Sequence, residues 1–151
     1  MIRIGEKILL TFWVGGLWFA GYVVAPILFQ VLDKKTAGLV AGHVFTVTSY
    51  IGIACTILLV LSLIIDSSVA RLKNYRIWML LVMLLLIFIG QFVLSPMMEE
   101  LKLEGLGNNL EAAGKFATLH GISSSLFLVN SIIGLILVII GLRPAGKESV
   151  A

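Results

Sequence analysis

Four long apolar stretches divide the chain, separated by short polar segments. About 20 mostly apolar residues are enough to carry an α-helix across the hydrocarbon core of a bilayer. The stretches cover about 8–31, 37–65, 77–97 and 116–142. We therefore predict an all-α fold in which 1–151 form a single transmembrane domain, an integral membrane four-helix antiparallel bundle.

The connections between the stretches are polar and differ in length. The first two are short, LDKK and DSSVARLKNYR, and the third is a longer acidic segment, 98–115, which we interpret as a loop. Pro26 removes a backbone hydrogen bond inside the first stretch and is expected to kink it. Pro96 is expected to help end the third helix.

Small and polar residues share one face of the second and fourth stretches. On a helix of 3.6 residues per turn, the second stretch lines up Gly38, Gly42, Phe45, Ser49, Gly52 and Thr56. The fourth lines up His120, Ser123, Ser124, Phe127, Asn130, Ser131 and Gly134. Lipid cannot hydrogen-bond such groups, so both faces are predicted to point into the bundle, with Gly42 at a close helix contact.

Composition supports a membrane protein. The chain is 60% hydrophobic and 13% charged, whereas soluble domains are about 45–50% apolar and about 25% charged. The net charge is +3, and the basic residues are scattered between the stretches, which is not the footprint of a nucleic-acid-binding protein. The single cysteine, Cys55, cannot form an intramolecular disulfide.

The distribution of Lys and Arg predicts the orientation in the membrane. Seven lie in the N-terminal segment, the second connection and the C-terminal tail: Arg3, Lys7, Arg71, Lys73, Arg76, Arg143 and Lys147. Four lie in the other two connections: Lys34, Lys35, Lys102 and Lys115. Because basic residues favour the cytoplasmic side, we expect a multi-pass protein of the cell membrane with both termini in the cytoplasm. The first stretch is longer than the apolar core of a cleaved signal peptide.

Polar residues from all four helices converge on the half of the bundle that this topology places outside. The residues at this depth are Gln30, His43, Gln91, Ser95 and His120. A ligand-binding pocket there would use His120, Ser123, Ser124, Asn130, Gln91, Ser95, Gln30 and Trp18. The same groups could instead hydrogen-bond one another and only fix the packing. A metal or haem site would use His43 and His120.

Catalysis has little support in the sequence. There is no HExxH zinc motif and no phosphate-binding loop. Ser123 and Ser124 follow His120, but no carboxylate lies near in sequence to orient the imidazole, and helix serines commonly bond to the carbonyl one turn back. We expect a protein that is not an enzyme and holds no cofactor.

Two segments resemble a known family. GLWFAGYVVAPILFQVLDKKTAGLVAGHVF and HGISSSLFLVN are similar to a small membrane family related to human transmembrane protein 205, whose bacterial members form a domain of unknown function. The resemblance implies a four-helix integral membrane protein with no established enzymatic activity. His43 departs from the family pattern. The matching residues are Trp18, Gly21, Phe29, Gly38, Phe45, His120, Gly121, Ser123, Ser124 and Asn130.

Three functional hypotheses follow. The first is a non-catalytic bundle, possible also as a homo-oligomer, that binds or passes a small solute or lipid or modulates a membrane partner. The second is a redox protein of the copper-resistance D or membrane protoporphyrinogen oxidase type. It would hold haem b between His43 and His120, or copper with Met97 or Met98 in addition. The third is an assembly partner whose acidic segment, 98–115, docks a basic surface.

Overall fold

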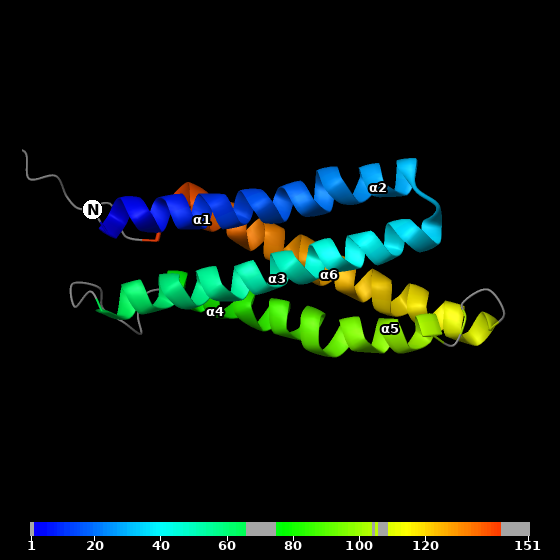
Figure 1. Cartoon of the computed structure of the whole chain (residues 1–151). Coiled ribbons are helices and arrows are strands. Elements are labelled where there is room, and N and C mark those ends of the chain that lie inside the picture. The colour runs from blue at the N-terminus through cyan, green and yellow to red at the C-terminus, as the bar shows by residue number, and fades with distance from the viewer. Residues whose placement is uncertain (1, 66–74, 104, 106–108, 143–151) are drawn as a thin grey trace, which may run out of the picture.

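Two helical hairpins make up the protein in the computed structural model, which describes residues 2–65, 75–103, 105 and 109–142 (Figure 1). The elements of the first hairpin are α1 (Ile2–Phe19), the π-helical segment η1 (Ala20–Val24), α2 (Ala25–Val31) and α3 (Lys34–Ile65). Those of the second are α4 (Tyr75–Phe88), the π-helical segment η3 (Ile89–Leu94), α5 (Ser95–Leu103) and α6 (Leu110–Ile140).

In the part of the chain that the structure describes, four helical rods run antiparallel through the bundle, and each is long and apolar enough to cross a membrane. A helix satisfies its own backbone hydrogen bonds, which hydrocarbon cannot do, so apolar segments of this length are stable in lipid as helices. The prediction of an all-α four-helix membrane bundle is confirmed.

The helices that follow the two hairpin turns begin with the same kind of cap. The Asp33 Oδ1 accepts hydrogen bonds from the backbone N–H groups of Lys35 and Thr36, both at 3.1 Å. The Asn109 Oδ1 accepts from those of Glu111 and Ala112, also at 3.1 Å. Each side chain thereby satisfies donors that the first turn of a helix leaves free.

The bundle has two unlike ends. We call the end that carries the start of α1 and the end of α6 the terminal end, and the end that carries residues 32–33 the turn end. At the terminal end α1 and α4 each contact both α3 and α6. The apolar core lies here, formed by Leu10, Trp13, Val14, Cys55, Leu59, Leu63, Leu80, Met83, Ile87, Leu137 and Leu142.

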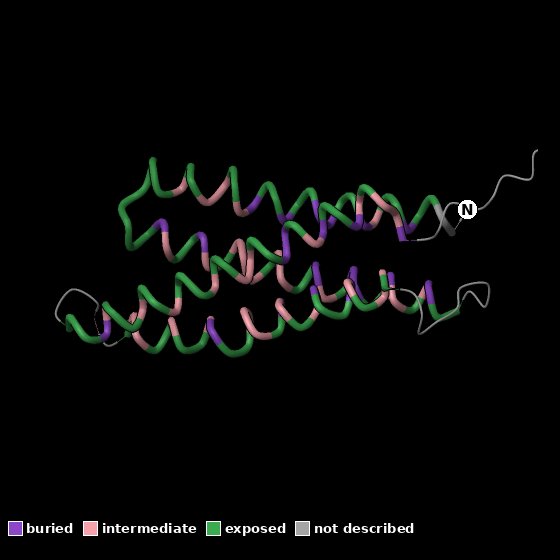
Figure 2. Tube along the Cα trace, turned by 180° about the vertical axis from the view of Figure 1, so that it is seen from behind, coloured by how far each residue is buried: buried purple, intermediate pink, exposed green. Residues whose placement is uncertain are grey.

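Toward the turn end the two hairpins diverge (Figures 1 and 2). Here α2 packs on α3 and α5 packs on α6, so the contacts are mainly within each hairpin. Figure 2 shows the buried positions gathered toward the terminal end. The turn half of the bundle therefore exposes surface that the terminal half buries.

Pro26 and Pro96 both lie inside continuous helical rods, which differs from the prediction that Pro96 helps end the third helix. Each lies just after a π-helical segment, where a backbone N–H bonds to the carbonyl five residues back: Ala25 to Ala20, and Ser95 to Gly90. The wider turn accommodates the ring that would clash with the preceding turn of a regular helix. Pro96 therefore does not end the third helix, which continues as α5.

The acidic segment 98–115 was predicted as a loop, and this is wrong for most of it. Helix α5 extends to Leu103 and α6 begins at Leu110. Ion pairs one turn apart support both extensions, Lys102 with Glu99 at 2.6 Å and Lys115 with Glu111 at 2.7 Å. Low hydropathy marks the end of the membrane-spanning part of a helix, but it does not mark the end of the helix.

The predicted close contact at Gly42 is also wrong. Apart from its chain neighbours and its own helix backbone, a Cβ placed at Gly42 would meet no atom of the described residues within 4 Å. The close contacts lie elsewhere: a Cβ at Gly52 would lie 2.7 Å from the Trp13 Nε1, and one at Gly21 would press on the Phe127 ring. Gly42 lies in the turn half, where the hairpins have already separated.

Candidate functional site

An aromatic cluster joins the two hairpins near the middle of the bundle. Trp18 lies 4.9 Å from Tyr22 between ring centroids, and Tyr22 lies 6.0 Å from Phe127. Phe45 meets Phe127 edge to face at 5.3 Å. The Trp18 Nε1 donates a hydrogen bond of 3.2 Å to the carbonyl oxygen of Ser131. Aromatic pairs in these tilted and edge-on geometries attract one another, so the cluster holds α1, α3 and α6 together.

One face of α6 changes its surroundings as it passes this cluster. On the terminal side of Phe127, Ser131 and Gly134 are buried; on the turn side, Ser124 and His120 are exposed. The spacing places all five residues on one side of the helix. The same face that is covered by the other hairpin in the terminal half is therefore uncovered in the turn half.

The corresponding face of α3 behaves in the same way. Gly52 is buried against Trp13, while Gly42 and Gly38 have open space where a side chain would start. Both glycines lie on the side of α3 that carries Phe45. We refer to the strip formed by Gly38, Gly42, Phe45, His120, Ser124 and Phe127, whose residues are half-buried or exposed, as the inter-hairpin face.

The predicted site residues all lie in the turn half or at its border, but side-chain hydrogen bonds do not join them among the described residues. Gln91 and Ser95 are half-buried, in η3 and at the start of α5, and Ser123 is half-buried on α6. Gln30 is exposed on α2. The Trp18 Nε1 donates its hydrogen bond to the backbone carbonyl of Ser131 and not to the side chain of another predicted site residue. The structure thus gathers these residues in one part of the bundle without joining them to one another by side-chain hydrogen bonds among the described residues.

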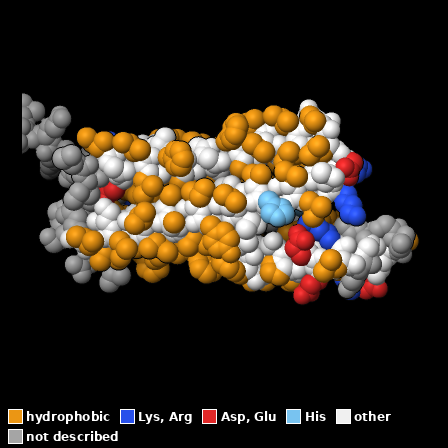
Figure 3. Space-filling view, viewed as in Figure 1, with side chains coloured by type: hydrophobic (Ala, Val, Ile, Leu, Met, Phe, Trp, Pro, Cys, Tyr) orange, Lys and Arg blue, Asp and Glu red, His pale blue; other side chains and the backbone are white. Residues whose placement is uncertain are grey.

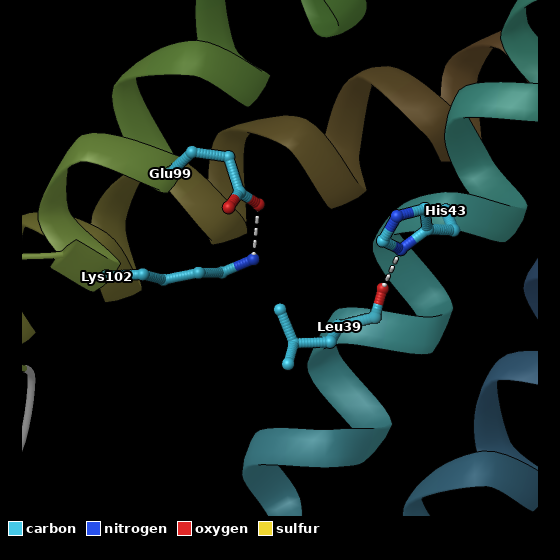
Figure 4. A network of polar contacts seen from close by, with 4 residues as sticks. All are labelled: Leu39, His43, Glu99 and Lys102. Atoms are coloured by element: carbon cyan, nitrogen blue, oxygen red, sulfur yellow. Dashed lines mark hydrogen bonds and ion pairs between the residues drawn. The ribbon is translucent and has the colours of Figure 1, made fainter.

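The two histidines each contact their own helix. The His43 Nδ1 donates to the Leu39 carbonyl oxygen at 2.9 Å, beside the Glu99–Lys102 ion pair of α5 (Figure 4). The His120 ring stacks on Phe116 at 6.0 Å with an interplanar angle of 8°. Among the described residues, no group of three or more His, Cys, Asp or Glu side chains is placed to hold a metal ion.

Asn130 is a buried polar residue whose side-chain oxygen is not hydrogen-bonded by the described residues. The residue is 4% exposed, and among the described residues its Oδ1 has no hydrogen-bond partner. The neighbouring Ser131 satisfies its hydroxyl on the Phe127 carbonyl at 2.8 Å. An unpaired buried carbonyl costs about 1–3 kcal/mol, and more in an apolar medium. The Asn130 Oδ1 is therefore a buried hydrogen-bond acceptor that is not satisfied by the described residues.

Charged side chains gather at the turn end (Figure 3). The Lys102 ammonium pairs with Glu99 and also lies 5.9 Å from the centroid of the Phe116 ring. Between α5 and α6 a shallow groove of about 620 Å³ is lined by both apolar and charged side chains, including Met97, Leu101 and Glu111. Hydrogen bonds from Thr36, through its side chain first and its backbone second, lower the pKa of Asp33.

Sequence reasoning missed a buried carboxyl at the opposite end. Glu6 lies just before the first predicted span and is 6% exposed. The Ser62 hydroxyl donates to its Oε1, which links α1 to α3 at the terminal end. A lone acidic residue beside an apolar stretch was the available signal, but only the fold shows that this face of α1 turns inward.

The rods, their hydropathy and their packing define a multi-pass integral membrane bundle. The chain belongs to a family described as a domain of unknown function, DUF4149, whose pattern matches residues 8–106. No curated protein and no solved structure gives a significant match. The resemblance to the transmembrane protein 205 family remains an expectation from the sequence motifs.

Proposed function

We propose that the protein is a non-catalytic membrane bundle that binds a small amphipathic molecule, a solute or a lipid, between its two hairpins in the turn half. The observation that carries this proposal is the inter-hairpin face. It lies on the same sides of α3 and α6 that are buried in the terminal half, yet Ser124 and His120 are exposed and Gly42 and Gly38 meet open space.

Polar groups at this depth favour a bound partner over bare lipid. Serine, histidine and asparagine side chains in a spanning helix are costly unless they find hydrogen-bond partners. The Ser125 hydroxyl bonds to the Gly121 carbonyl of its own helix at 2.9 Å. No such bond satisfies Ser124 among the described residues, so its hydroxyl remains available to a ligand.

The position of the face along the bundle indicates an amphipathic occupant. On one side it ends at the aromatic cluster, and on the other it approaches the charged turn end with Lys102, Glu99 and Asp33. A molecule seated there would place an apolar part on Phe45 and Phe127 and a polar part toward the membrane surface. The divergence of the hairpins gives access from the surface or sideways from the bilayer.

Saturable quenching of tryptophan fluorescence tests the proposal. The protein would carry Trp78→Phe, which leaves the buried Trp13 and the half-exposed Trp18 as emitters, and would be held in lipid nanodiscs. The probe is 6-bromo-2-naphthol, whose bromine quenches an indole on contact. We expect a saturable component on top of the linear quenching that partition into lipid produces.

Filling the inter-hairpin face should remove the saturable component. Gly42→Leu places a side chain in the open space, whereas Val47→Leu on the exposed side of the same helix is the matched control. Linear quenching alone in the unfilled protein, or equal saturable binding to the Gly42→Leu and Val47→Leu variants, would contradict the proposed function.

A further inference from the structure

The first helical rods of the two hairpins repeat one pattern. Each contains a π-helical segment followed by a proline in the next α-helix, Pro26 in one and Pro96 in the other. Aromatic side chains stand four and eight residues before each proline: Tyr22 and Trp18, and Phe92 and Phe88. Their buried positions also share one spacing, Leu10-x-x-Trp13-x-x-x-Leu17 and Leu80-x-x-Met83-x-x-x-Ile87.

The second helices of the two hairpins, α3 and α6, share a different sequence pattern. The segment Phe45-x-x-Thr48-Ser49-x-x-Gly52 of α3 corresponds to Phe127-x-x-Asn130-Ser131-x-x-Gly134 of α6. Continued toward the turn end, the same alignment pairs Gly42 with Ser124 and Gly38 with His120. The inter-hairpin face is therefore built from three pairs of corresponding positions.

Contacts within the two hairpins follow this correspondence. In the first, a Cβ on Gly52 would meet Trp13 at 2.7 Å, and in the second, a Cβ on Gly134 would meet Met83 at 3.1 Å. Trp13 and Met83 are themselves corresponding residues. Helix α1 packs on α3 and α6, and α4 packs on α6 and α3. Phe45 and Phe127 contact each other directly. Corresponding residues that touch must lie at the axis that relates their two halves.

We propose that the chain consists of two hairpin repeats related by a pseudo-two-fold axis along the bundle. In our proposal this axis passes through the ligand site, and Asn130 is its specificity-determining acceptor for the hydroxyl of a neutral, ring-bearing amphiphile. The proposal rests on the proposed function, because it names what the inter-hairpin face selects. Helices interrupted at corresponding positions of two halves are a recurrent mark of binding sites at repeat interfaces in membrane transporters.

Asn130 is where the two halves differ in chemistry. Its counterpart Thr48 donates its hydroxyl to the Val44 carbonyl at 2.8 Å and is satisfied within its own helix. The Asn130 Oδ1 is buried and unpartnered, about one turn from Phe127 on the terminal side. A ligand hydroxyl donating to this oxygen would supply a hydrogen bond, and the corresponding position of the other hairpin, Thr48, offers no side-chain carbonyl oxygen.

The rest of the ligand class follows from the surrounding side chains. Phe45, Phe127 and Tyr22 present ring faces and edges, which favour a ring in stacked or edge-on contact. The inter-hairpin face contains no Asp, Glu, Lys or Arg. A neutral ligand body therefore fits it better than a charged one.

The experiment compares two brominated probes that differ by one hydroxyl group. Saturable quenching is measured in nanodiscs with 6-bromo-2-naphthol and with 2-bromonaphthalene, in the same Trp78→Phe protein. We expect the naphthol to bind about two- to tenfold more tightly, the range of one neutral hydrogen bond. Asn130→Thr should abolish this preference while 2-bromonaphthalene still binds. The reason is that a threonine hydroxyl can donate to the carbonyl one turn back in its own helix, as that of Thr48 does.

Exchanging the two corresponding residues tests the axis. The double variant Asn130→Thr with Thr48→Asn should recover the preference for the naphthol, since the acceptor returns at the symmetry-related position. Equal binding of the two probes to the unsubstituted protein, or a preference that survives Asn130→Thr, would overturn the role of Asn130. Absence of recovery in a folded double variant would overturn the two-fold relation. Absence of saturable binding by either probe would instead refute the proposed function.

Discussion

Glycine residues on one face of α3 differ in how much space surrounds them, and so in what the methyl group of an alanine at the same position would contact. At Gly52 it would press on the Trp13 Nε1 at 2.7 Å and the Ile87 Cδ1 at 2.9 Å. We expect Gly52→Ala to lower the free energy of unfolding by about 1–3 kcal/mol, the usual cost of overpacking. Thermal unfolding in detergent checks this. Gly42→Ala is the matched control and should leave the melting temperature unchanged or slightly higher, and equal losses in the two variants would refute the packing described for α3.

Asp33 predicts a pH-dependent cap at the start of α3. The pKa of its carboxyl is lowered in the folded protein by the hydrogen bonds from Thr36. Its stabilisation is therefore present above the pKa of the unfolded chain, about 3.9, and is lost as the pH falls through the folded pKa.

The corresponding experiment follows melting temperature against pH for Asp33→Ala. The variant should melt below the unsubstituted protein at pH 7, and the difference should shrink as the pH falls below about 4. Asn109→Ala removes the uncharged cap of α6 and should show a difference that does not follow this titration. A pH-independent difference for Asp33→Ala would contradict the assignment.

Residue patterns show which side of a helix carries polar groups and glycines, but they do not show which of these residues contact another helix. Gly42 and Gly52 share one face of α3, so sequence spacing alone cannot tell which of them touches another helix. The separation of the hairpins decides it, and that separation depends on packing across the whole bundle. His120 likewise stacks on Phe116 of its own helix, and no side-chain hydrogen bond joins it to Gln91 or Ser95 among the described residues.

Each hairpin contains a π-helical segment just before a proline, η1 before Pro26 and η3 before Pro96. Pro26→Ala or Pro96→Ala removes the ring that disfavours a regular α-helical turn, so the segment before it should return to α-helix. Spin labels at Ile8 and Ile27, both exposed, should report a changed distance in the Pro26→Ala variant. The Pro96→Ala variant should leave this pair of labels unchanged. An unaltered distance after Pro26→Ala would show that packing, not the proline, maintains η1.

Element boundaries were predicted where hydropathy and helix ends coincide, as at Val31. They were missed where a helix leaves the membrane and continues, as α5 does through Glu99 and Lys102. The prediction treated Pro96 as a stop because it considered only α-helical geometry. A π-helical turn before the proline removes that conflict, and single-residue propensities do not reveal it.

Orientation is a property of the whole bundle and remains a prediction from the seven basic residues on one side and four on the other. In a Cys55→Ser background, a cysteine at Asn109 should react with a membrane-impermeant maleimide added to intact cells. A cysteine at Tyr75 should react only after the cells are opened. The reverse pattern would place the terminal end outside.

Each repeat contains an even number of spanning rods, so both halves enter the membrane in the same direction. If the two hairpins were identical subunits of a dimer, both would carry the same residue at the position of Thr48 and Asn130. The axis would then be flanked by two asparagines or by two threonines. A single chain is free of that constraint, and this one carries Thr48 on one side and Asn130 on the other. The proposed site would therefore bind one asymmetric ligand in one orientation, with a stoichiometry of one ligand per chain.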